Sequence, residues 1–211
     1  MTVPTILVAD DHPMFREALK LAISRAVPGA RIVEAGQLGE AADVARSEAA
    51  LDLILLDLKM PGAAGFSGVA LMHAERPGTP ILVVSSADQA DAAPRARAYG
   101  AIGFISKTAG LDALEAAVRR ALAGECDPAD ESAPDAAVED MAQRIATLTP
   151  AEIKVLLGVL AGRLNKQIAF DLGISEATVK GHMTVIMRKM NVQNRTQAVL
   201  AAKALDIEIP D

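Results

Sequence analysis

Five polar residues follow four short apolar segments of the chain, and their side-chain types suit phosphoryl chemistry. Asp10 and Asp11 end the first segment, Asp57 the second, Ser85 the third, and Lys107 follows the fourth. Carboxylates brought together repel one another unless a cation joins them, and hard oxygen ligands suit Mg²⁺. A hydroxyl and an ammonium beside such a cation can contact phosphate oxygens. The set therefore predicts a magnesium-assisted phosphoryl site.

Each of these residues also has a simpler structural explanation. An Asp-Asp pair before a helix can be only a cap, a serine after a strand a turn residue, and a lone lysine a solvated charge. Asp57, taken alone, reads as a strand-ending acid. Their common position at strand ends favours a shared site over several unrelated explanations.

The elements that must position these residues alternate between strands and helices. Alternating elements of this kind indicate βαβ units and a parallel sheet covered on both faces. Residues 1–123 are therefore predicted to form an α/β domain, a flavodoxin-like doubly wound five-stranded parallel sheet. In that strand order the first and third strands are neighbours, which brings Asp10 and Asp11 next to Asp57. The predicted strands are 5–9, 31–35, 51–57, 80–85 and 100–106, and the predicted helices 13–26, 39–49, 66–74, 88–99 and 111–123. Pro94 should leave the fourth helix short, kinked or late in starting.

Residues 124–147 break this rhythm. They carry the acid excess of a chain whose formal net charge is −6, and they are rich in Ala and Pro. They are predicted to form a flexible acidic linker, with a helical turn or two between Val138 and Ile145. A single cysteine, Cys126, excludes an intramolecular disulfide framework. With neither a leader pattern nor an apolar run of membrane-spanning length, the sequence predicts a soluble cytoplasmic protein.

Residues 148–211 are predicted to form a small all-α domain. Thr149 and Glu152 have the spacing of a capping box, and Asn165 and Ser175 are placed to cap two further helices joined through a glycine. The helix from Glu176 to Met190 has one apolar stripe, and its opposite side carries basic residues and no acid after Glu176. A solvated surface helix would explain the charges, but the whole pattern favours a helix-turn-helix that approaches DNA phosphates.

The first half resembles the receiver domain of bacterial two-component response regulators. The segments LVADDHPMFREAL, LILLDLKMPG, PILVVSS and GFISK carry the resemblance, which covers residues 1–123. It implies a phospho-acceptor at Asp57 and an aromatic switch residue at Phe104, with Ser85 and Lys107 contacting phosphoryl oxygens. The implied Mg²⁺ ligands are Asp11, Asp57, the backbone carbonyl of Lys59 and, through water, Asp10. Thr108 stands where many receivers have proline.

The second half closely resembles the LuxR-type helix-turn-helix, through LTPAEIKVL, AGRLNKQIAFDLGISEATVKGHMTVIMRKM and NVQNRTQAV. By that resemblance Glu176–Met190 is the recognition helix, and residues 196–205 form a helix through which such domains dimerise. Bases would be read by Thr178, Lys180 and Thr184, with Gly181 permitting close backbone approach. The residues expected near phosphates are Lys166, Arg188, Lys189, Asn194 and Arg195.

The whole chain thus resembles a NarL/FixJ-type response regulator. The resemblance implies a DNA-binding transcription regulator switched by phosphorylation, not an enzyme, and no membrane partner. Its partners would be a sensor histidine kinase or another phospho-donor, a double-stranded DNA operator and, on activation, a second copy of the chain. Two alternatives stay open: a DNA-binding regulator whose receiver is not phosphorylated, and a Mg²⁺-dependent phosphohydrolase with an aspartyl-phosphate intermediate. The second usually needs an acid two residues after the nucleophile, where this chain has Lys59.

Overall fold

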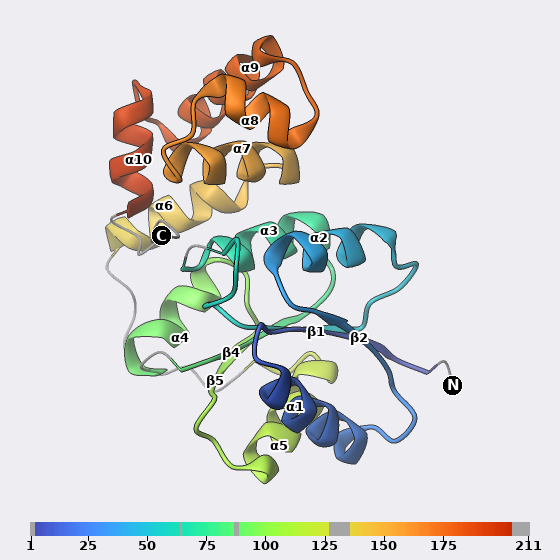
Figure 1. The fold of residues 1–211 in the computed structure, drawn as a ribbon. Coiled ribbons are helices and arrows are strands. Elements are labelled where there is room, and N and C mark those ends of the chain that lie inside the picture. The colour runs from blue at the N-terminus through green and yellow to red at the C-terminus, as the bar shows by residue number, and fades with distance from the viewer. Residues whose placement is uncertain (1–2, 64, 87–88, 127–135, 204–211) are drawn as a thin grey trace.

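The computed structural model describes residues 3–63, 65–86, 89–126 and 136–203 of the chain. In the first of two domains, five strands form a single sheet in the order β2-β1-β3-β4-β5, and every neighbouring pair is parallel. This confirms the predicted flavodoxin-like sheet, with β1 and β3 side by side (Figure 1). The strands are β1 (Thr5–Ala9), β2 (Arg31–Ala35), β3 (Leu53–Leu56), β4 (Ile81–Ser85) and β5 (Gly103–Ser106).

Five helices cover the two faces of this sheet (Figure 1). Helices α1 and α5 pack on one face, where alternate strand residues such as Ile6, Val8 and Leu55 are fully buried. Helices α2, α3 and α4 lie on the other face, above Leu7, Ile54 and Leu56. Strands buried on both faces explain why the sequence shows continuous apolar runs instead of alternation. The helices are α1 (Pro13–Ala26), α2 (Leu38–Ser47), α3 (Ser67–Glu75), α4 (Gln89–Ala98) and α5 (Leu111–Leu122).

Helix α4 continues past Pro94, which is buried within it. Proline has no N–H, so α4 lacks the hydrogen bond that residue 94 would give to the carbonyl four residues before it. The helix nevertheless spans ten residues, close to the predicted range.

The second domain is entirely helical, as predicted, and polar side chains cap the helices that begin at Pro150 and Glu176. Thr149 and Glu152 form the predicted capping box: the Glu152 N–H donates to Thr149 Oγ1 (3.3 Å) and the Thr149 N–H to Glu152 Oε2 (2.8 Å). Ser175 Oγ accepts from the N–H of Thr178 (3.1 Å). The helices are α7 (Pro150–Leu160), α8 (Asn165–Leu172), α9 (Glu176–Met190) and α10 (Arg195–Lys203).

The predicted cap at Asn165 is wrong. Leu164 is the N-cap of α8, and its N–H is satisfied by Gln167 Oε1 at 2.8 Å. Asn165 is the first helical residue, and its Oδ1 instead accepts a hydrogen bond from Arg195 Nη1 (2.9 Å). Asn165 therefore bonds a residue distant in sequence instead of capping the helix, and the local sequence does not reveal that partner.

Between the domains lies α6 (Ala136–Ala146), inside the range predicted as a linker. It is longer than the expected turn or two because Ala142 and Ile145 are buried, giving the helix an apolar face to pack. Helix α6 contacts α3 and α4 on one side and α9 on the other. Residues 127–135 of the predicted linker lie outside the described residues.

Helix α3 joins the two domains into one apolar core. Its residues from Ser67 to Met72 are all buried, so no face of this segment is open to solvent. One side packs on the sheet and α2, and another packs against α6 and α7 (Figure 1). A helix that is apolar all round needs cover on every side, and α3 obtains the second cover from the C-terminal domain.

An ion-pair cluster borders this interface. The carboxylate of Glu75, at the end of α3, lies 3.3 Å from Lys154 Nζ of α7 and 3.1 Å from Arg46 Nη2 of α2.

Within the described residues, no helix combines the length and apolar character needed to cross a bilayer.

Candidate functional site

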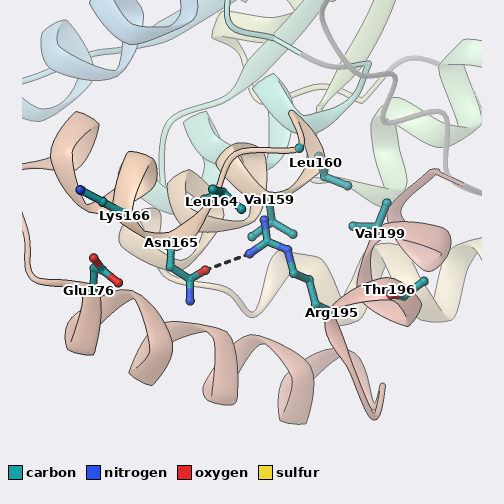
Figure 2. A pocket seen from close by; sticks show the side chains of 10 residues that line it. Val159, Leu160, Leu164, Asn165, Lys166, Glu176, Arg195, Thr196 and Val199 are labelled. Atoms are coloured by element: carbon teal, nitrogen blue, oxygen red, sulfur yellow. Dashed lines mark hydrogen bonds between the residues drawn. The ribbon is translucent and has the colours of Figure 1, made fainter.

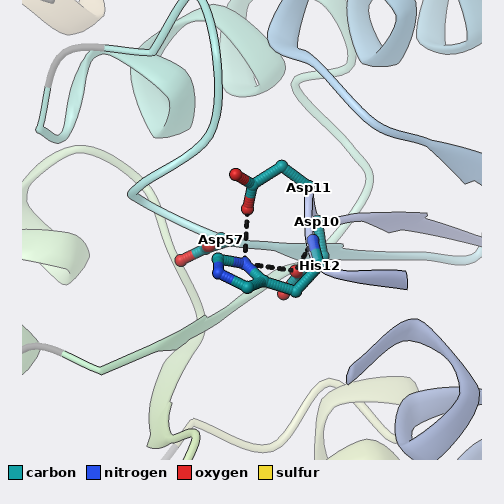
Figure 3. Close-up of side chains that lie close together, drawn as sticks. All are labelled: Asp10, Asp11, His12 and Asp57. Carbon is teal, nitrogen blue, oxygen red and sulfur yellow. Dashed lines mark hydrogen bonds and ion pairs between the residues drawn. The ribbon is translucent and has the colours of Figure 1, made fainter. Parts of the chain in front are cut away.

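Three carboxylates and one imidazole converge at the carboxyl edge of the sheet (Figure 3). Asp10 and Asp11 follow β1, Asp57 follows β3, and His12 is the residue that precedes α1. One ligand atom from each of the four lies within 4.8 Å of the others. The parallel pairing of β1 with β3 positions Asp57 here, because the Asp57 N–H donates to the carbonyl of Ala9 at 2.9 Å. The predicted meeting of Asp10 and Asp11 with Asp57 is therefore present.

Lys107 enters the cluster from the end of β5. Its Nζ lies 2.7 Å from Asp10 Oδ2 and 2.7 Å from Asp57 Oδ2, and only 14% of its side chain is exposed. Burial alone would lower the pKa of Lys107, but hydrogen bonds to Asp10 and Asp57 outweigh it and raise the pKa above its ordinary value. Lys107 therefore stays protonated at neutral pH. Its ammonium also lies 4.9 Å from the centroid of the Phe15 ring, a cation–π contact.

An open cavity of about 530 Å³ leads from the surface to this cluster. Asp57, Lys107, Lys59 and His12 contribute polar lining, together with the exposed Ser86. Met14 and Phe15 of α1 contribute apolar lining. Sequence reasoning missed Ser86 and assigned no site role to His12, although both directly follow residues that it did select.

The other predicted residues of this site lie at or near the same edge. Ser85 ends β4 and is fully buried, and its carbonyl accepts from the Lys107 N–H at 2.9 Å. Phe104 lies within β5 and is buried, facing the side of α2, α3 and α4. Lys59 is exposed and lines the cavity, and its N–H donates to Asp57 Oδ1 at 3.1 Å.

The donor set fits a hard divalent cation. The three carboxylates carry three negative charges against the single positive charge of Lys107. Asp11 Oδ1 is buried and accepts no hydrogen bond from the described residues. Uncompensated buried carboxylate charge is costly, and a divalent cation would remove the excess.

The second candidate site is the outer face of α9. Val179, Met183, Ile186 and Met190 turn inward, as predicted. The opposite face is exposed to solvent and carries Thr178, Lys180, Gly181, Thr184 and Arg188. Figure 1 shows α9 on the side of its domain away from the sheet, so the first domain does not cover this face. An exposed helix face that carries two cations and no acid, and that follows a short helix and a glycine turn, can enter the major groove of DNA.

Lys189 differs from the other predicted phosphate contacts. Its Nζ donates to Glu152 Oε2 (2.7 Å) and to the Thr147 carbonyl (2.9 Å), so it ties the end of α9 to the start of α7. Burial alone would raise the pKa of Glu152, but its bonds to Lys189 and to the Thr149 N–H lower the pKa below its usual value. The geometry makes Lys189 a support for α9.

Arg195 also has partners within the protein. It hydrogen bonds Asn165 Oδ1 and the Arg163 carbonyl at the side of an open groove of about 790 Å³ between α7, α8 and α10 (Figure 2). Lys166 lines the same groove and is exposed, whereas Asn194 uses its Oδ1 to accept from the Gln197 N–H at the start of α10 (2.9 Å).

Comparisons with known proteins match both halves of the chain. Residues 6–119 match the response regulator receiver domain, and residues 146–202 match the bacterial regulatory proteins of the luxR family. The chain is 37% identical to the glycerol metabolism activator of Pseudomonas putida, over 95% of this chain and 96% of that protein. It is 34% identical to the nitrate/nitrite response regulator protein NarL of Escherichia coli K12, over 93% of each.

A solved structure agrees with these matches. The crystal structure of a LuxR-family two-component response regulator from Aurantimonas sp. SI85-9A1 superposes with a TM-score of 0.55 at 29% identity. It covers 62% of this chain and 92% of that one.

Proposed function

This chain belongs to the two-component response regulators that join a receiver domain to a LuxR-type helix-turn-helix, and from that premise we propose that phosphorylation of Asp57 controls its binding to DNA. The observation that carries the proposal is the convergence of Asp10, Asp11, Asp57 and Lys107 at one end of an open cavity. On this proposal residues 1–123 form the receiver, 124–147 the connection and 148–211 the DNA-binding domain.

In the proposed reaction a carboxylate oxygen of Asp57 attacks a phosphoryl donor, and the bond from phosphorus to the leaving group breaks as the new P–O bond forms. The donor would be a sensor histidine kinase or a small acyl phosphate. Lys107 already reaches Asp57 Oδ2, so its ammonium can follow the charge onto the phosphoryl oxygens. Ser85 at the end of β4 and the exposed Ser86 beside the cavity would supply hydroxyls, and Phe104 would repack as Ser85 moves.

We assign the cation to Mg²⁺, held by Asp11, Asp57 and the Lys59 carbonyl, with Asp10 acting through water. When bound, Mg²⁺ would neutralise charge on the transferring phosphoryl group. The charge excess of the cluster and the buried Asp11 Oδ1, which accepts no hydrogen bond from the described residues, support this assignment.

The DNA-binding part of the proposal rests on the exposed face of α9. Thr178, Lys180, Gly181 and Thr184 would face bases, while Lys166 and Arg188 are exposed cations suited to phosphates. Arg195 and Asn194 flank them, and Lys189 would act by holding α9 in place. Dimerisation through α10 would present two such helices to half-sites about one helical turn apart.

The test is phosphoryl uptake by Asp57→Asn. With acetyl phosphate and MgCl₂, the wild type should gain one phosphoryl group by intact-protein mass spectrometry and bind its operator more tightly, whereas Asp57→Asn should gain none. Asp52→Asn, at an exposed acid before β3, is the matched control and should label like the wild type. Full labelling of Asp57→Asn would overturn the assignment.

One observation favours a second candidate, in which the receiver is present but DNA binding does not need phosphorylation. The face of α9 that would meet DNA is open while the two domains are docked. Equal operator affinity with and without acetyl phosphate, in a protein shown to be labelled, would support this candidate over the first.

A further inference from the structure

His12 stands next to the proposed cation site without a role in the proposed phosphorylation. It occupies the N-cap position of α1 in an extended conformation, yet its side chain makes no capping hydrogen bond. Its backbone N–H instead donates to Asp10 Oδ1 at 2.8 Å, and its imidazole lies beside the carboxylates of Asp10 and Asp11. Figure 3 shows the ring lying between Asp11 and Asp10.

The approach of the imidazole to Asp11 is very close. Nδ1 lies 2.6 Å from Asp11 Oδ1 and 3.5 Å from Asp10 Oδ1. The contact is an ion pair when the imidazole is protonated, yet Asp11 Oδ1 accepts no hydrogen bond from the described residues. A carboxylate oxygen and a ring nitrogen this close share a positive charge, which either a proton in an ion pair or a bound cation can supply.

These spacings match adjacent ligands of one metal ion. With metal–ligand bonds of about 2.1 Å, neighbouring ligands of an octahedral ion are about 3.0 Å apart. The two distances from Nδ1, 2.6 Å and 3.5 Å, fall on either side of that value. The exposed imidazole can adjust by rotation about its side-chain bonds, since 66% of its side chain is open to solvent.

Accordingly, we propose that His12 is a nitrogen ligand of the cation site and lets it take first-row transition ions such as Co²⁺ or Zn²⁺ in addition to Mg²⁺. This inference rests on the proposed magnesium site and adds a ligand to it. Imidazole nitrogen suits borderline ions and contributes little to Mg²⁺, which prefers oxygen. The carboxylates therefore bind both kinds of ion, whereas His12 raises the affinity for transition ions alone. A transition ion held this way would use the same carboxylates as the phosphoryl reaction and would compete with Mg²⁺.

The test measures binding of two cations, Co²⁺ and Mg²⁺, to the full-length unphosphorylated protein by titration calorimetry, with Co²⁺ also followed by its visible absorption. His12→Ala should weaken Co²⁺ binding at least about tenfold, since even losing a supporting residue beside a ligand has that effect. Mg²⁺ binding should change by less than about twofold, which is under 0.5 kcal/mol. The visible bands of bound Co²⁺ should shift, because a nitrogen ligand has been lost.

His182→Ala is the matched control: it removes a half-buried imidazole from α9 and should leave both cations unaffected. Asp11→Asn should weaken both. If the wild type binds neither cation, the proposed magnesium site fails. If it binds both and His12→Ala is indistinguishable from the wild type, or loses Co²⁺ and Mg²⁺ affinity by the same factor, only the role of His12 is overturned.

Discussion

At the scale of single residues, Lys107 holds two carboxylates together that would otherwise repel each other. Its ammonium bridges Asp10 and Asp57, which come from different strands. Lys107→Met should therefore lower the free energy of unfolding by about 1.5–3 kcal/mol in EDTA, the range for hydrogen bonds to charged groups. Saturating MgCl₂ should restore most of the loss, because a bound cation supplies the missing positive charge.

Urea unfolding with EDTA or with MgCl₂ measures both effects. Lys20→Met is the control, because Lys20 pairs with Glu17 and Glu34 on the surface of α1. Its stability should respond to MgCl₂ no more than that of the wild type. A Lys107→Met protein as stable as the wild type in EDTA would show that the bridge contributes nothing.

The stability of the fold should depend on pH through Glu152. Its folded pKa lies below the unfolded value of about 4.3, so its charged form stabilises the fold above that pH and the contribution disappears as pH falls through the folded pKa. Glu152→Gln keeps an oxygen for the Thr149 N–H but loses the charge facing Lys189. The stability gap between wild type and variant, from thermal unfolding, should be widest near pH 7 and should narrow as the pH falls below the unfolded pKa and through the folded pKa. A gap that persists at low pH would mean that the charge is not its cause.

The sequence predicted the acid cluster well and the basic residues less well, for a physical reason. Asp10, Asp11 and Asp57 follow directly from strand ends, and a parallel sheet brings such ends to one edge. Lys189 and Arg195 have long flexible side chains whose partners, Glu152 and Asn165, are distant in sequence. Only the packing of α7, α8 and α9 reveals that these cations are already engaged.

At the scale of elements, two glycines in the DNA-binding domain should respond oppositely to the same change. A Cβ on Gly158 of α7 would lie 2.8 Å from Cγ1 of the buried Ile168 of α8. Gly158→Ala should therefore destabilise the domain by about 1–2 kcal/mol, since overpacking outweighs the gain in helix propensity. Gly181 of α9 has open space around it, so Gly181→Ala should stabilise by up to about 1 kcal/mol.

Denaturant unfolding measures the stability change of each variant, and operator binding adds a second measurement for Gly181→Ala. Because Gly181 lies on the face proposed to meet DNA, Gly181→Ala should weaken operator binding while the fold becomes more stable. Stabilisation by Gly158→Ala would mean that the space between α7 and Ile168 of α8 can accommodate a methyl group.

The positions of most elements were predictable because apolar runs and turn residues mark them. The ends of α6 and the packing of α6 and α7 against α3 were not predictable, because both depend on a contact between domains. The apolar character of α3 is present in the sequence, but the residues near it in sequence do not indicate which helices pack against its second side. Similarly, the continuation of α4 through Pro94 depends on the surroundings that bury the proline.

At the scale of the whole molecule, Glu75 links the two domains while the DNA-facing side of α9 stays open. Glu75→Lys would set three cations against one another, since Lys154 and Arg46 both bind the native carboxylate. The domains should separate, and the radius of gyration from small-angle X-ray scattering should rise. Operator affinity of the unphosphorylated protein should change by less than about threefold, under 1 kcal/mol, because docking covers no part of the proposed DNA contact.

Asp43→Lys changes the net charge by the same amount and removes an exposed partner of the same Arg46, so it is the matched control and should stay compact. A gain of more than about tenfold in operator affinity on separation, some 1.4 kcal/mol, would instead mean that docking restrains DNA binding.

The burial of α3 on all sides also determines how the protein behaves when it is divided. A fragment ending near Cys126 would retain the sheet and all its strand-end residues, yet the side of α3 that meets α6 and α7 would lie in water. Exposed apolar surface of this kind promotes self-association. Aggregation or dimerisation of the isolated receiver would then report a missing neighbour instead of a signalling state.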